Sequence, residues 1–440
     1  MIFEVKKYPN NINTQITIPP DKSISHRAVL LNIIANGNKA KIENFLFSDD
    51  TMASINFARS IGIVVECDKD KKIVYIIKNN LQNANKEIDC LNSGTTARLC
   101  ISILAGLGLR GVVTGDYSLL KRPMNRITGF LKDMNCNIYD NNGKLPVFIS
   151  KSSLNKIDME SEIGSAQQKT AWIIANLLGK GNNSCYKSKR KSRDHTEIML
   201  KAMNCELIVE SSQHYNEIIK ITDNSGIPKM KDFTIPSDFS SAAFFIVFAL
   251  ICKDCNLTLK SININPTRAY LLDILKKMNG NITILNEKQI DGEIVADIIV
   301  KTSILNGIKI NEKEKIPFFI DEIPILSIAM FFASGNSEIH GVEELRFKEC
   351  DRINKIIELG AFFGVEVYEK NNTIYLTKNI IEKTDFINAE NDHRIIMTAV
   401  ILCILTQRKL KLDSISGINV SFPSFLKKFM EFGYEFKYSN

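Results

Sequence analysis

Six stretches of the chain share one pattern of polar and apolar residues. In each, a strand-like run ends in small or polar residues, and a stretch that is apolar on nearly every helical face follows. The six are IPPDKSISHRAVLLNIIA (18–35), LNSGTTARLCISILAGL (91–107), IGSAQQKTAWIIANLL (163–178), IPSDFSSAAFFIVFAL (235–250), FIDEIPILSIAMFFASG (319–335) and ENDHRIIMTAVILCIL (390–405). A helix that is apolar all round must be buried. The pattern therefore predicts six buried helices with polar residues at their N-terminal ends.

The six stretches recur at a near-constant period. Their marker residues are Ser23, Gly94, Ser165, Asp238, Asp321 and Asp392. The first three are 71 residues apart, and the last three are 83 and 71 residues apart. This period indicates internal repetition. IPPDKS (18–23) also lines up with IPSDFS (235–240), which predicts two domains of three repeats each.

Strand-like and amphipathic helical runs lie between these stretches. KKIVYIIK (71–78) and NTIYLT (372–377) are typical of strands, and YLLDILKKMNG (270–280) is typical of a half-buried helix. Alternation of this kind favours an α/β fold. If the buried helices of each domain point their N-termini the same way, each domain has a positive end that attracts anions.

Cations gather near the predicted helix starts, where acids are usually favoured because the helix dipole is positive there. These cations are Lys22, Arg27, Arg98, Arg122, Arg352 and Arg394. Any one of them alone fits a solvated cap or an ion pair, just as Asp321 alone fits an N-cap and Gly94 a turn. Arginine suits bidentate recognition of phosphate and carboxylate. Together the cations predict a cleft for a ligand that supplies the missing negative charge.

The segment EELRFKECDRINKIIELG (343–360) adds a further group of charged residues to this set. Lys348, Glu349 and Arg352 lie together at a predicted helix start. Lys348 and Arg352 are four residues apart, so we expect them to share one helical face.

Composition narrows the class of protein. The chain has 440 residues, 45% hydrophobic and 24% charged, which fits two globular domains. A net charge of +7 fits acidic small substrates better than nucleic acid, which requires a dense basic stripe. The longest apolar run, AAFFIVFALIC (242–252), is too short to span a bilayer, and the N-terminus has no apolar signal region. These features predict a cytoplasmic protein without membrane or nucleic-acid partners.

The cysteines and histidines give no metal signal. The chain has ten scattered cysteines, and Cys252 and Cys255 form a CxxC with no second pair to complete a zinc site. Reduced, buried cysteines are the better interpretation. His26 and His195 lack metal-ligand spacing, so we interpret them as polar residues at the rim of the site.

Eight ordered motifs resemble the 3-phosphoshikimate 1-carboxyvinyltransferase (EPSP synthase) family. They are DKSISHRA, NSGTTAR, LLKRPM, GSAQQKTA, SRDHTE, IDEIPIL, LRFKECDRI and NDHRI, and the resemblance runs from about residue 18 to residue 428. The SAQQK and SRDHTE forms resemble the bacterial class that tends to tolerate glyphosate.

The resemblance implies an inside-out α/β barrel fold. Each of two domains has three βαβαββ repeats with parallel helices buried inside. The first domain would span 20–234 and the second 1–19 and 235–440, with the active site in the cleft between them. The implied reaction is enolpyruvyl transfer from phosphoenolpyruvate to the 5-hydroxyl of shikimate 3-phosphate, with release of phosphate. This step belongs to the shikimate pathway of aromatic amino acid biosynthesis. No cofactor is implied, and we expect a monomer.

The resemblance also implies roles for single residues. Asp321 would take the proton from the 5-hydroxyl, Glu349 would serve proton transfer at carbon 3, and Lys22 would stabilise charge near both substrates. The residues expected to hold shikimate 3-phosphate are Lys22, Ser23, Arg27, Ser165, Ala166 (through its backbone), Gln167, Ser192, Asp321 and Lys348. Those expected to hold phosphoenolpyruvate are Lys22, Gly94, Arg122, Gln167, Arg352 and Arg394.

The chain departs from the family pattern at three positions. Some members have two adjacent serines where this chain has Ser165 and Ala166, some have a phosphate-contacting lysine where it has Val420, and some have a tyrosine where it has His195. Two other functions remain open at this point. One is the sister transferase acting on UDP-N-acetylglucosamine, which usually has a reactive cysteine where this chain has Tyr117. The other is a non-catalytic polyanion binder that uses the basic segment KSKRKSR (187–193).

Overall fold

The computed structural model describes residues 1–439. The chain folds into two compact units. Unit 1 contains Met1–Pro19, Ser237–Lys288 and the chain from Ile294 onward; unit 2 contains Pro20–Pro236 and Gln289–Glu293. The sequence pattern does not predict that 289–293 belongs to unit 2.

Three helices fill the interior of unit 2. They are α1 (Lys22–Ile34), α3 (Gly94–Leu107) and α6 (Ala166–Leu178), and most of their residues are buried. Each begins after a side chain that accepts a hydrogen bond from a first-turn backbone N–H: Asp21, Ser93 and Ser165. Such caps fix where each helix starts. The predicted burial and starting points are confirmed here.

Three helices likewise fill the interior of unit 1: α8 (Phe239–Ile251), α10 (Ile323–Phe332) and α12 (His393–Thr406). Asp238 and Asp392 cap α8 and α12. Helix α10 differs because two 3-10 segments, η2 (Lys313–Phe318) and η3 (Ile320–Glu322), come before it. Asp321 therefore lies inside η3 and does not cap α10; Glu322 occupies the cap position.

The remaining helices surround these three-helix groups. In unit 2 they are α2 (Asp49–Ser60), α4 (Tyr117–Lys121), α5 (Asn125–Asp133), α7 (His195–Ala202) and η1 (Asp223–Ser225). In unit 1 they are α9 (Leu271–Lys277), η4 (Glu343–Phe347), α11 (Arg352–Phe363), η5 (Ser416–Val420) and α13 (Phe425–Glu431).

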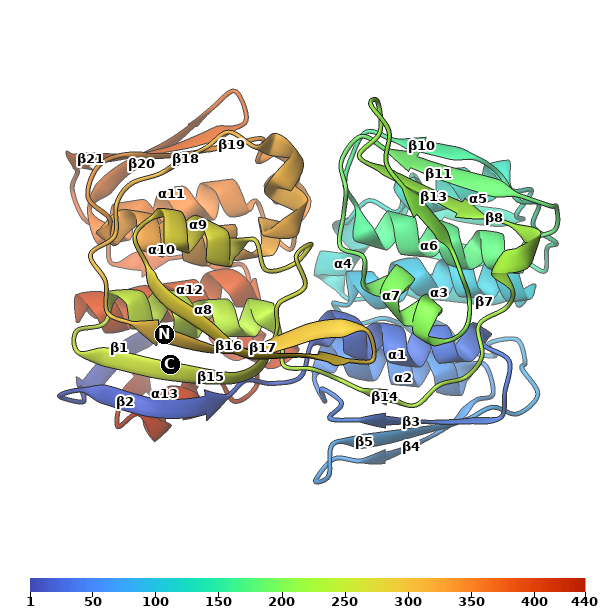
Figure 1. Ribbon diagram of the computed structural model, residues 1–440, viewed down its shortest axis with the longest axis horizontal. Coiled ribbons are helices and arrows are strands. Elements are labelled where there is room, and N and C mark those ends of the chain that lie inside the picture. The colour runs from blue at the N-terminus through green and yellow to red at the C-terminus, as the bar shows by residue number, and fades with distance from the viewer. Residues whose placement is uncertain (440) are drawn as a thin grey trace. The chain divides into compact units, whose positions relative to one another are not determined.

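Each unit has three four-stranded sheets. In unit 2 the first sheet has the strand order β14 (Phe233–Thr234), β3 (Lys39–Glu43), β5 (Ile73–Ile77), β4 (Val64–Asp68). The second has the order β6 (Ile88–Asp89), β7 (Gly111–Thr114), β9 (Lys144–Ile149), β8 (Ile138–Asn141). The third has the order β10 (Met159–Ser161), β11 (Ser184–Ser188), β13 (Glu217–Ile221), β12 (Ile208–Glu210). Figure 1 shows α3 and α6 between the sheet of β10, β11 and β13 and the sheet of β3, β4 and β5.

In unit 1 the first sheet has the strand order β2 (Ile12–Thr17), β15 (Cys255–Asn263), β17 (Glu293–Lys301), β16 (Asn281–Ile290). The second has the order β18 (Lys309–Ile310), β19 (Ser337–His340), β21 (Thr373–Ile380), β20 (Val365–Lys370). The third has the order β22 (Phe386–Ile387), β23 (Leu410–Leu412), β1 (Ile2–Lys7), β24 (Glu435–Ser439). In every sheet of both units the first two strands are parallel, as in the pairs β6–β7 and β18–β19. The six sheets thus repeat one topology, and the predicted βαβαββ repeat is confirmed.

Two strands are exchanged where the chain passes from one unit to the other. β2 precedes α1 in sequence but pairs with β15 of unit 1, whereas β14 precedes α8 but pairs with β3 of unit 2. Reciprocal backbone bonds accompany the exchange: Asp21 N–H donates to the Pro236 carbonyl (2.7 Å), and Asp238 N–H donates to the Pro19 carbonyl (2.8 Å). The similar segments IPPDKS and IPSDFS lie at the two positions where the chain passes between the units.

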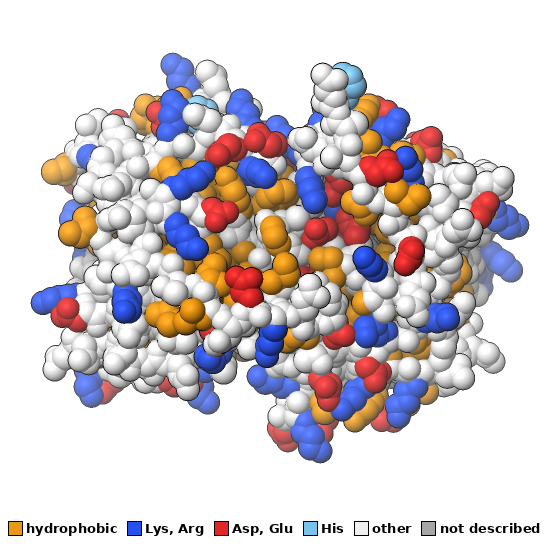
Figure 2. Space-filling model, in the orientation of Figure 1, with side chains coloured by type: hydrophobic (Ala, Val, Ile, Leu, Met, Phe, Trp, Pro, Cys, Tyr) orange, Lys and Arg blue, Asp and Glu red, His pale blue; other side chains and the backbone are white. Residues whose placement is uncertain are grey.

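The surface carries mixed charge. On the face shown in Figure 2, acidic and basic side chains are interspersed and no continuous basic stripe is visible. Across residues 1–439, no helix combines the length and apolarity needed to cross a membrane. The ten cysteines are all free; seven are buried, and Cys67, Cys185 and Cys252 are partly exposed, so predicted burial holds for most of them.

A cluster of aromatic rings closes one side of the unit 1 core. The Phe429 ring of α13 lies 5.0 Å from the rings of both Phe245 and Phe248 of α8, and 5.3 Å from that of Phe425. Phe429 is fully buried. Because α13 is only seven residues long, this packing rather than helix propensity holds it in place.

We expect Phe429→Ala to lower the free energy of unfolding by about 3–5 kcal/mol, because it leaves a cavity among packed rings. Chemical denaturation followed by circular dichroism measures the loss. Phe148→Ala is the control: its ring is 48% exposed on β9, and its loss should cost less than about 1 kcal/mol. Equal losses for the two variants would contradict this account of α13.

Candidate active site

Asp321 lies among three cations in unit 1. Its Oδ1 is 3.2 Å from Arg352 Nη1 and 3.4 Å from Lys348 Nζ, and its Oδ2 is 3.7 Å from Arg394 Nη2. The carboxylate side chain is 16% exposed, so it is reachable by a small ligand. Asp321 is thus a carboxylate held among three cations and still accessible from solvent.

Arg352, the first residue of α11, is the most constrained cation of this group. Nε lies 2.8 Å from Asp392 Oδ2, and Nη2 lies 2.6 Å from Glu349 Oε2. Burial lowers the pKa of Arg352, but Asp392, Glu349 and Asp321 outweigh this effect and raise the pKa above its ordinary value. Arg352 is therefore always charged and is held in one orientation.

Sequence reasoning gave Asp392 no role beyond that of a repeat marker. In the structure Asp392 is completely buried, caps α12 through the N–H groups of Arg394 and Ile395, and binds Arg352. The sequence signal for its capping role is its place in NDHRI, directly before the apolar run that begins with His393 and Arg394. The contact with Arg352, forty residues earlier in the chain, left no trace in the sequence.

The expectation that Lys348 and Arg352 share a helical face is wrong. Helix α11 begins only at Arg352, and Lys348 lies before it, just after η4. Asp351 accepts bonds from the first-turn N–H groups and so sets the helix start there. The two cations still reach the same carboxylate, Asp321, by different routes.

Arg394 joins the starts of the three core helices of unit 1. It is the second residue of α12, and its Nη1 donates to the Asp321 carbonyl at 3.2 Å. The same Nη1 lies 3.8 Å from Oε1 of buried Glu322, which accepts a hydrogen bond from Ser240 in the first turn of α8. The N-terminal ends of α8, α10 and α12 therefore meet at this point.

In unit 2, Gly94, Gln167 and Arg122 gather around the start of α3. Arg98 Nη1 donates to Gln167 Oε1 at 2.7 Å, and Gln167 Nε2 donates to the hydroxyl of Thr95 at 2.9 Å. A Cβ atom on Gly94 would lie 2.7 Å from Arg98 Nη1 and 3.4 Å from Arg122 Nη1. Glycine here lets guanidinium groups approach the helix start, where backbone N–H groups attract anions.

Arg122 is held by unit 2 itself. Its Nη2 donates to Asn92 Oδ1 at 2.7 Å and to the Ser118 hydroxyl at 3.2 Å. Because Arg122 is buried, these contacts aim its guanidinium at the start of α3.

The contacts of Lys22 differ from the expectation that a ligand supplies the missing negative charge at this helix start. The chain itself supplies negative charge at the start of α1: Lys22 Nζ lies 2.9 Å from Asp50 Oδ2, and Asp21 caps the helix. Asp50 belongs to α2, and nothing in the sequence links it to Lys22. A ligand is therefore not the only counter-ion of this lysine.

Arg27 binds side chains of two other helices. Nε donates to the Thr196 hydroxyl at 2.8 Å, Nη2 donates to the Thr170 hydroxyl at 3.1 Å, and Nη1 donates to the Ser23 carbonyl at 3.1 Å. Arg27 is buried, whereas Ser23 is half-buried. Arg27 thus links α1 to α6 and α7.

The serines expected to bind ligand differ in exposure. Ser165, half-buried, accepts a bond from Gln168 N–H at 3.3 Å, and Ala166 is the first residue of α6. Ser192 is buried in the segment between β11 and α7, where its hydroxyl donates to Glu217 Oε2 at 3.4 Å. Sequence reasoning missed Glu217, which is distant in sequence and lies at the start of β13.

The two histidines are not rim residues, so that interpretation is wrong. His26 is 1% exposed and its Nδ1 lies 2.8 Å from the Ser54 hydroxyl. Burial, then Lys22 and Arg27, hold the pKa of His26 well below its usual value, so the ring is neutral. His195 is fully buried, with Nδ1 2.6 Å from Glu293 Oε1 in the segment 289–293 of unit 2.

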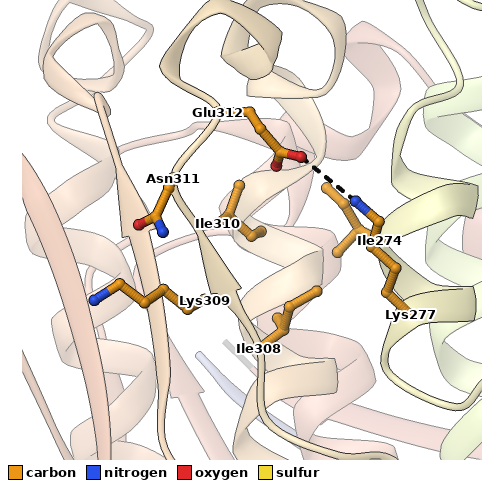
Figure 3. A pocket seen from close by; sticks show the side chains of 7 residues that line it. All are labelled: Ile274, Lys277, Ile308, Lys309, Ile310, Asn311 and Glu312. Carbon is orange, nitrogen blue, oxygen red and sulfur yellow. Dashed lines mark hydrogen bonds and ion pairs between the residues drawn. The ribbon is translucent and has the colours of Figure 1, made fainter.

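Unit 1 also has a pocket of about 340 Å³ that is separate from the candidate residues. It is lined by Ile274, Lys277, Ile308, Lys309, Ile310, Asn311 and Glu312 (Figure 3). Lys277 Nζ lies 3.5 Å from Glu312 Oε1, so these two charged groups of the pocket neutralise each other.

Val420, at the position where the resemblance leads us to expect a lysine, is the last residue of η5 and is half-buried.

Solved structures share this architecture. An EPSP synthase from Acinetobacter baumannii aligns with a TM-score of 0.83 and 30% identity, covering 99% of this chain and 100% of that chain. The enolpyruvyl transferase NikO from Streptomyces tendae aligns with a TM-score of 0.73 over 100% of this chain and 98% of its own, but at 12% identity it shows the fold alone.

Sequence comparisons agree with these structures. The chain is 39% identical over 418 residues to a 3-phosphoshikimate 1-carboxyvinyltransferase from Caldicellulosiruptor saccharolyticus, covering 94% of this chain and 95% of that protein. It is 38% identical over 436 residues to one from Clostridium tetani, covering 97% and 96%. The family model for EPSP synthase (3-phosphoshikimate 1-carboxyvinyltransferase) matches residues 6–429. With its helix-start clusters and these similarities, the chain belongs to the EPSP synthase family.

Proposed function

We propose that the protein transfers the enolpyruvyl group of phosphoenolpyruvate to the 5-hydroxyl of shikimate 3-phosphate and releases phosphate. The observation that carries the proposal is the position of Asp321 beside Lys348, Arg352 and Arg394. A base surrounded by cations suits a reaction in which an alcohol loses a proton beside two anionic substrates.

Phosphoenolpyruvate has two anionic ends, and the chain has two groups of cations for them. Arg352 and Arg394 would bind the carboxylate, since both already bind carboxylates of the chain. The α3 start with Gly94, together with Arg122 and Gln167, would bind the phosphate. One group belongs to unit 1 and the other to unit 2, so we infer that both units act on the same substrate pair.

Shikimate 3-phosphate would be held by a larger and mainly polar set. It comprises Lys22, Ser23, Arg27, Ser165, Ala166 (through its backbone), Gln167, Ser192, Asp321 and Lys348. The half-buried Ser165 and Ala166 at the start of α6 support this assignment. Val420 leaves one phosphate contact of the family without an equivalent at that position.

The chemistry divides into addition and elimination. In the addition, Asp321 takes the proton of the 5-hydroxyl, the oxygen forms a bond to carbon 2 of phosphoenolpyruvate, and a proton delivered through Glu349 adds to carbon 3. In the elimination, carbon 3 returns a proton, the carbon–oxygen bond to phosphate breaks, and the double bond forms again. Lys22 would touch both substrates and stabilise charge near the reacting centre.

The two other functions have less support. The sister transferase would use a cysteine in the loop 115–122, which has Tyr117 and no cysteine. A polyanion binder would have no use for the buried Arg352 with its three carboxylates, and the face in Figure 2 has interspersed charge. A cytoplasmic monomer remains the prediction from sequence.

We expect Asp321→Asn to lower kcat by roughly a hundredfold to ten-thousandfold, the usual contribution of a general base. Binding of shikimate 3-phosphate should change little, because the amide is nearly isosteric. Phosphate release that requires both substrates measures turnover, and calorimetry measures binding. Asp385→Asn, at an exposed aspartate of unit 1, is the control and should keep full activity. Turnover of Asp321→Asn within a factor of about three of the unmodified protein would rule out the base.

We expect Gly94→Ala to raise KM for phosphoenolpyruvate by roughly tenfold to a hundredfold, because the added methyl group displaces the guanidinium of Arg98 or Arg122 from the phosphate position. The melting temperature should change little, since the displaced atom ends a flexible side chain. Steady-state kinetics with each substrate varied gives the result. Gly129→Ala, where nothing lies within 4 Å of the new Cβ, is the matched control. An unchanged KM for phosphoenolpyruvate would contradict the assignment of this helix start.

A further inference from the structure

A buried charge cluster in unit 2 has no part in the function described above. Lys169 of α6 is fully buried and its Nζ lies 2.6 Å from Glu197 Oε1 and 2.7 Å from Glu217 Oε1. Burial lowers the pKa of Lys169, but the two carboxylates outweigh it and raise the pKa above its ordinary value. An ammonium with two carboxylates in a dry interior is costly to assemble. Hydrophobic residues would fill the space more cheaply, so the cluster needs another explanation.

The two glutamates differ in what else they touch. Glu197 lies on α7, and the ion pair of its Oε1 with Lys169 is its contact with this cluster. Glu217 uses its second oxygen as well: Oε2 accepts the hydroxyl of Ser192 at 3.4 Å, and the backbone of Ser192 also hydrogen-bonds to Glu217. Glu217 therefore connects the buried ammonium to the segment 189–194, which carries a candidate substrate residue.

We propose that Glu217, fixed by Lys169, is a positioning residue that holds Ser192 in place for shikimate 3-phosphate. The inference rests on the proposed function, because it needs Ser192 to contact that substrate. Ser192 lies in a loop with no regular structure between β11 and α7. Such a segment stays ordered only if its own polar groups find partners. Glu217 supplies one partner to both the backbone and the side chain of Ser192.

A carboxylate is required for this role. Each of its oxygens accepts a hydrogen bond, one from Lys169 and the other from Ser192. An amide has one acceptor oxygen only. Glutamine at position 217 can turn its NH₂ group toward Ser192, whose hydroxyl could accept from it but whose backbone N–H could not. If it turns the NH₂ group toward Lys169, the contact with the ammonium is lost, so glutamine keeps only part of the carboxylate's contacts.

The test compares two substitutions that remove the same charge from the same lysine. Glu217→Gln should weaken binding of shikimate 3-phosphate roughly tenfold, the loss expected for a hydrogen bond to a charged group. The KM for phosphoenolpyruvate should stay unchanged. Glu197→Gln should leave both values unchanged or bind shikimate 3-phosphate slightly more tightly, because removing a negative charge favours an anionic ligand. Weaker binding for both variants, or for neither, would overturn the proposal.

Ser192→Ala separates this inference from the proposed function. Ser192→Ala should weaken shikimate 3-phosphate binding, and adding Glu217→Gln should weaken it little further, because both changes act through one contact. Fully additive losses would overturn the inference and leave the enzyme's function untouched. Absence of turnover with both substrates in the unmodified protein would instead refute the function. If Glu217→Gln does not fold, Glu217→Asp replaces it: aspartate keeps two acceptors but reaches less far, and unchanged binding would again overturn the proposal.

Discussion

The burial of six largely apolar helices constrains everything else in this protein. Helices such as α3 and α8 bury apolar side chains along most of their length, so sheets surround them. Their charged residues, such as Arg27 of α1 and Lys169 of α6, lie in the N-terminal half of the helix. At an N-terminal end, free N–H groups and the helix dipole favour anions. The fold therefore favours anion sites as a consequence of its packing, and the candidate site residues lie near the points where the apolar stretches begin.

Charge compensation is the second theme that unites the two units. The cations at the helix starts already have carboxylate partners: Asp50 for Lys22, and Asp392, Glu349 and Asp321 for Arg352. These partners hold the cations in defined orientations, which costs less than ordering them when a ligand arrives. They also compete with an anionic ligand. A substrate must therefore offer a better match than the internal carboxylates, which favours ligands that have two anionic groups at the right separation.

The sequence predicted the features that depend on local pattern. The six buried helices and their start points follow from apolar runs preceded by capping residues, and the repeat follows from their period. The motif of Asp321 predicts its place near the start of α10, but the two 3-10 segments before that helix have no counterpart in the sequence pattern. What the sequence could not show were contacts between distant segments. Asp50 beside Lys22, Glu217 beside Ser192, and the burial of His26 and His195 depend on how strands and helices pack, and single-residue patterns do not encode that.

The strand exchange between the units has a consequence for synthesis of the chain. Unit 2 is one continuous segment, residues 20–236, apart from residues 289–293. Most of this unit can therefore form as soon as it leaves the ribosome. Unit 1 cannot, because β1 pairs with β23 and β24, and the N-terminal amino group bonds a carbonyl 411 residues later. At typical elongation rates β1 waits on the order of tens of seconds for these partners. Throughout that interval β1 has no strand to pair with, so unit 1 forms later than unit 2 during synthesis.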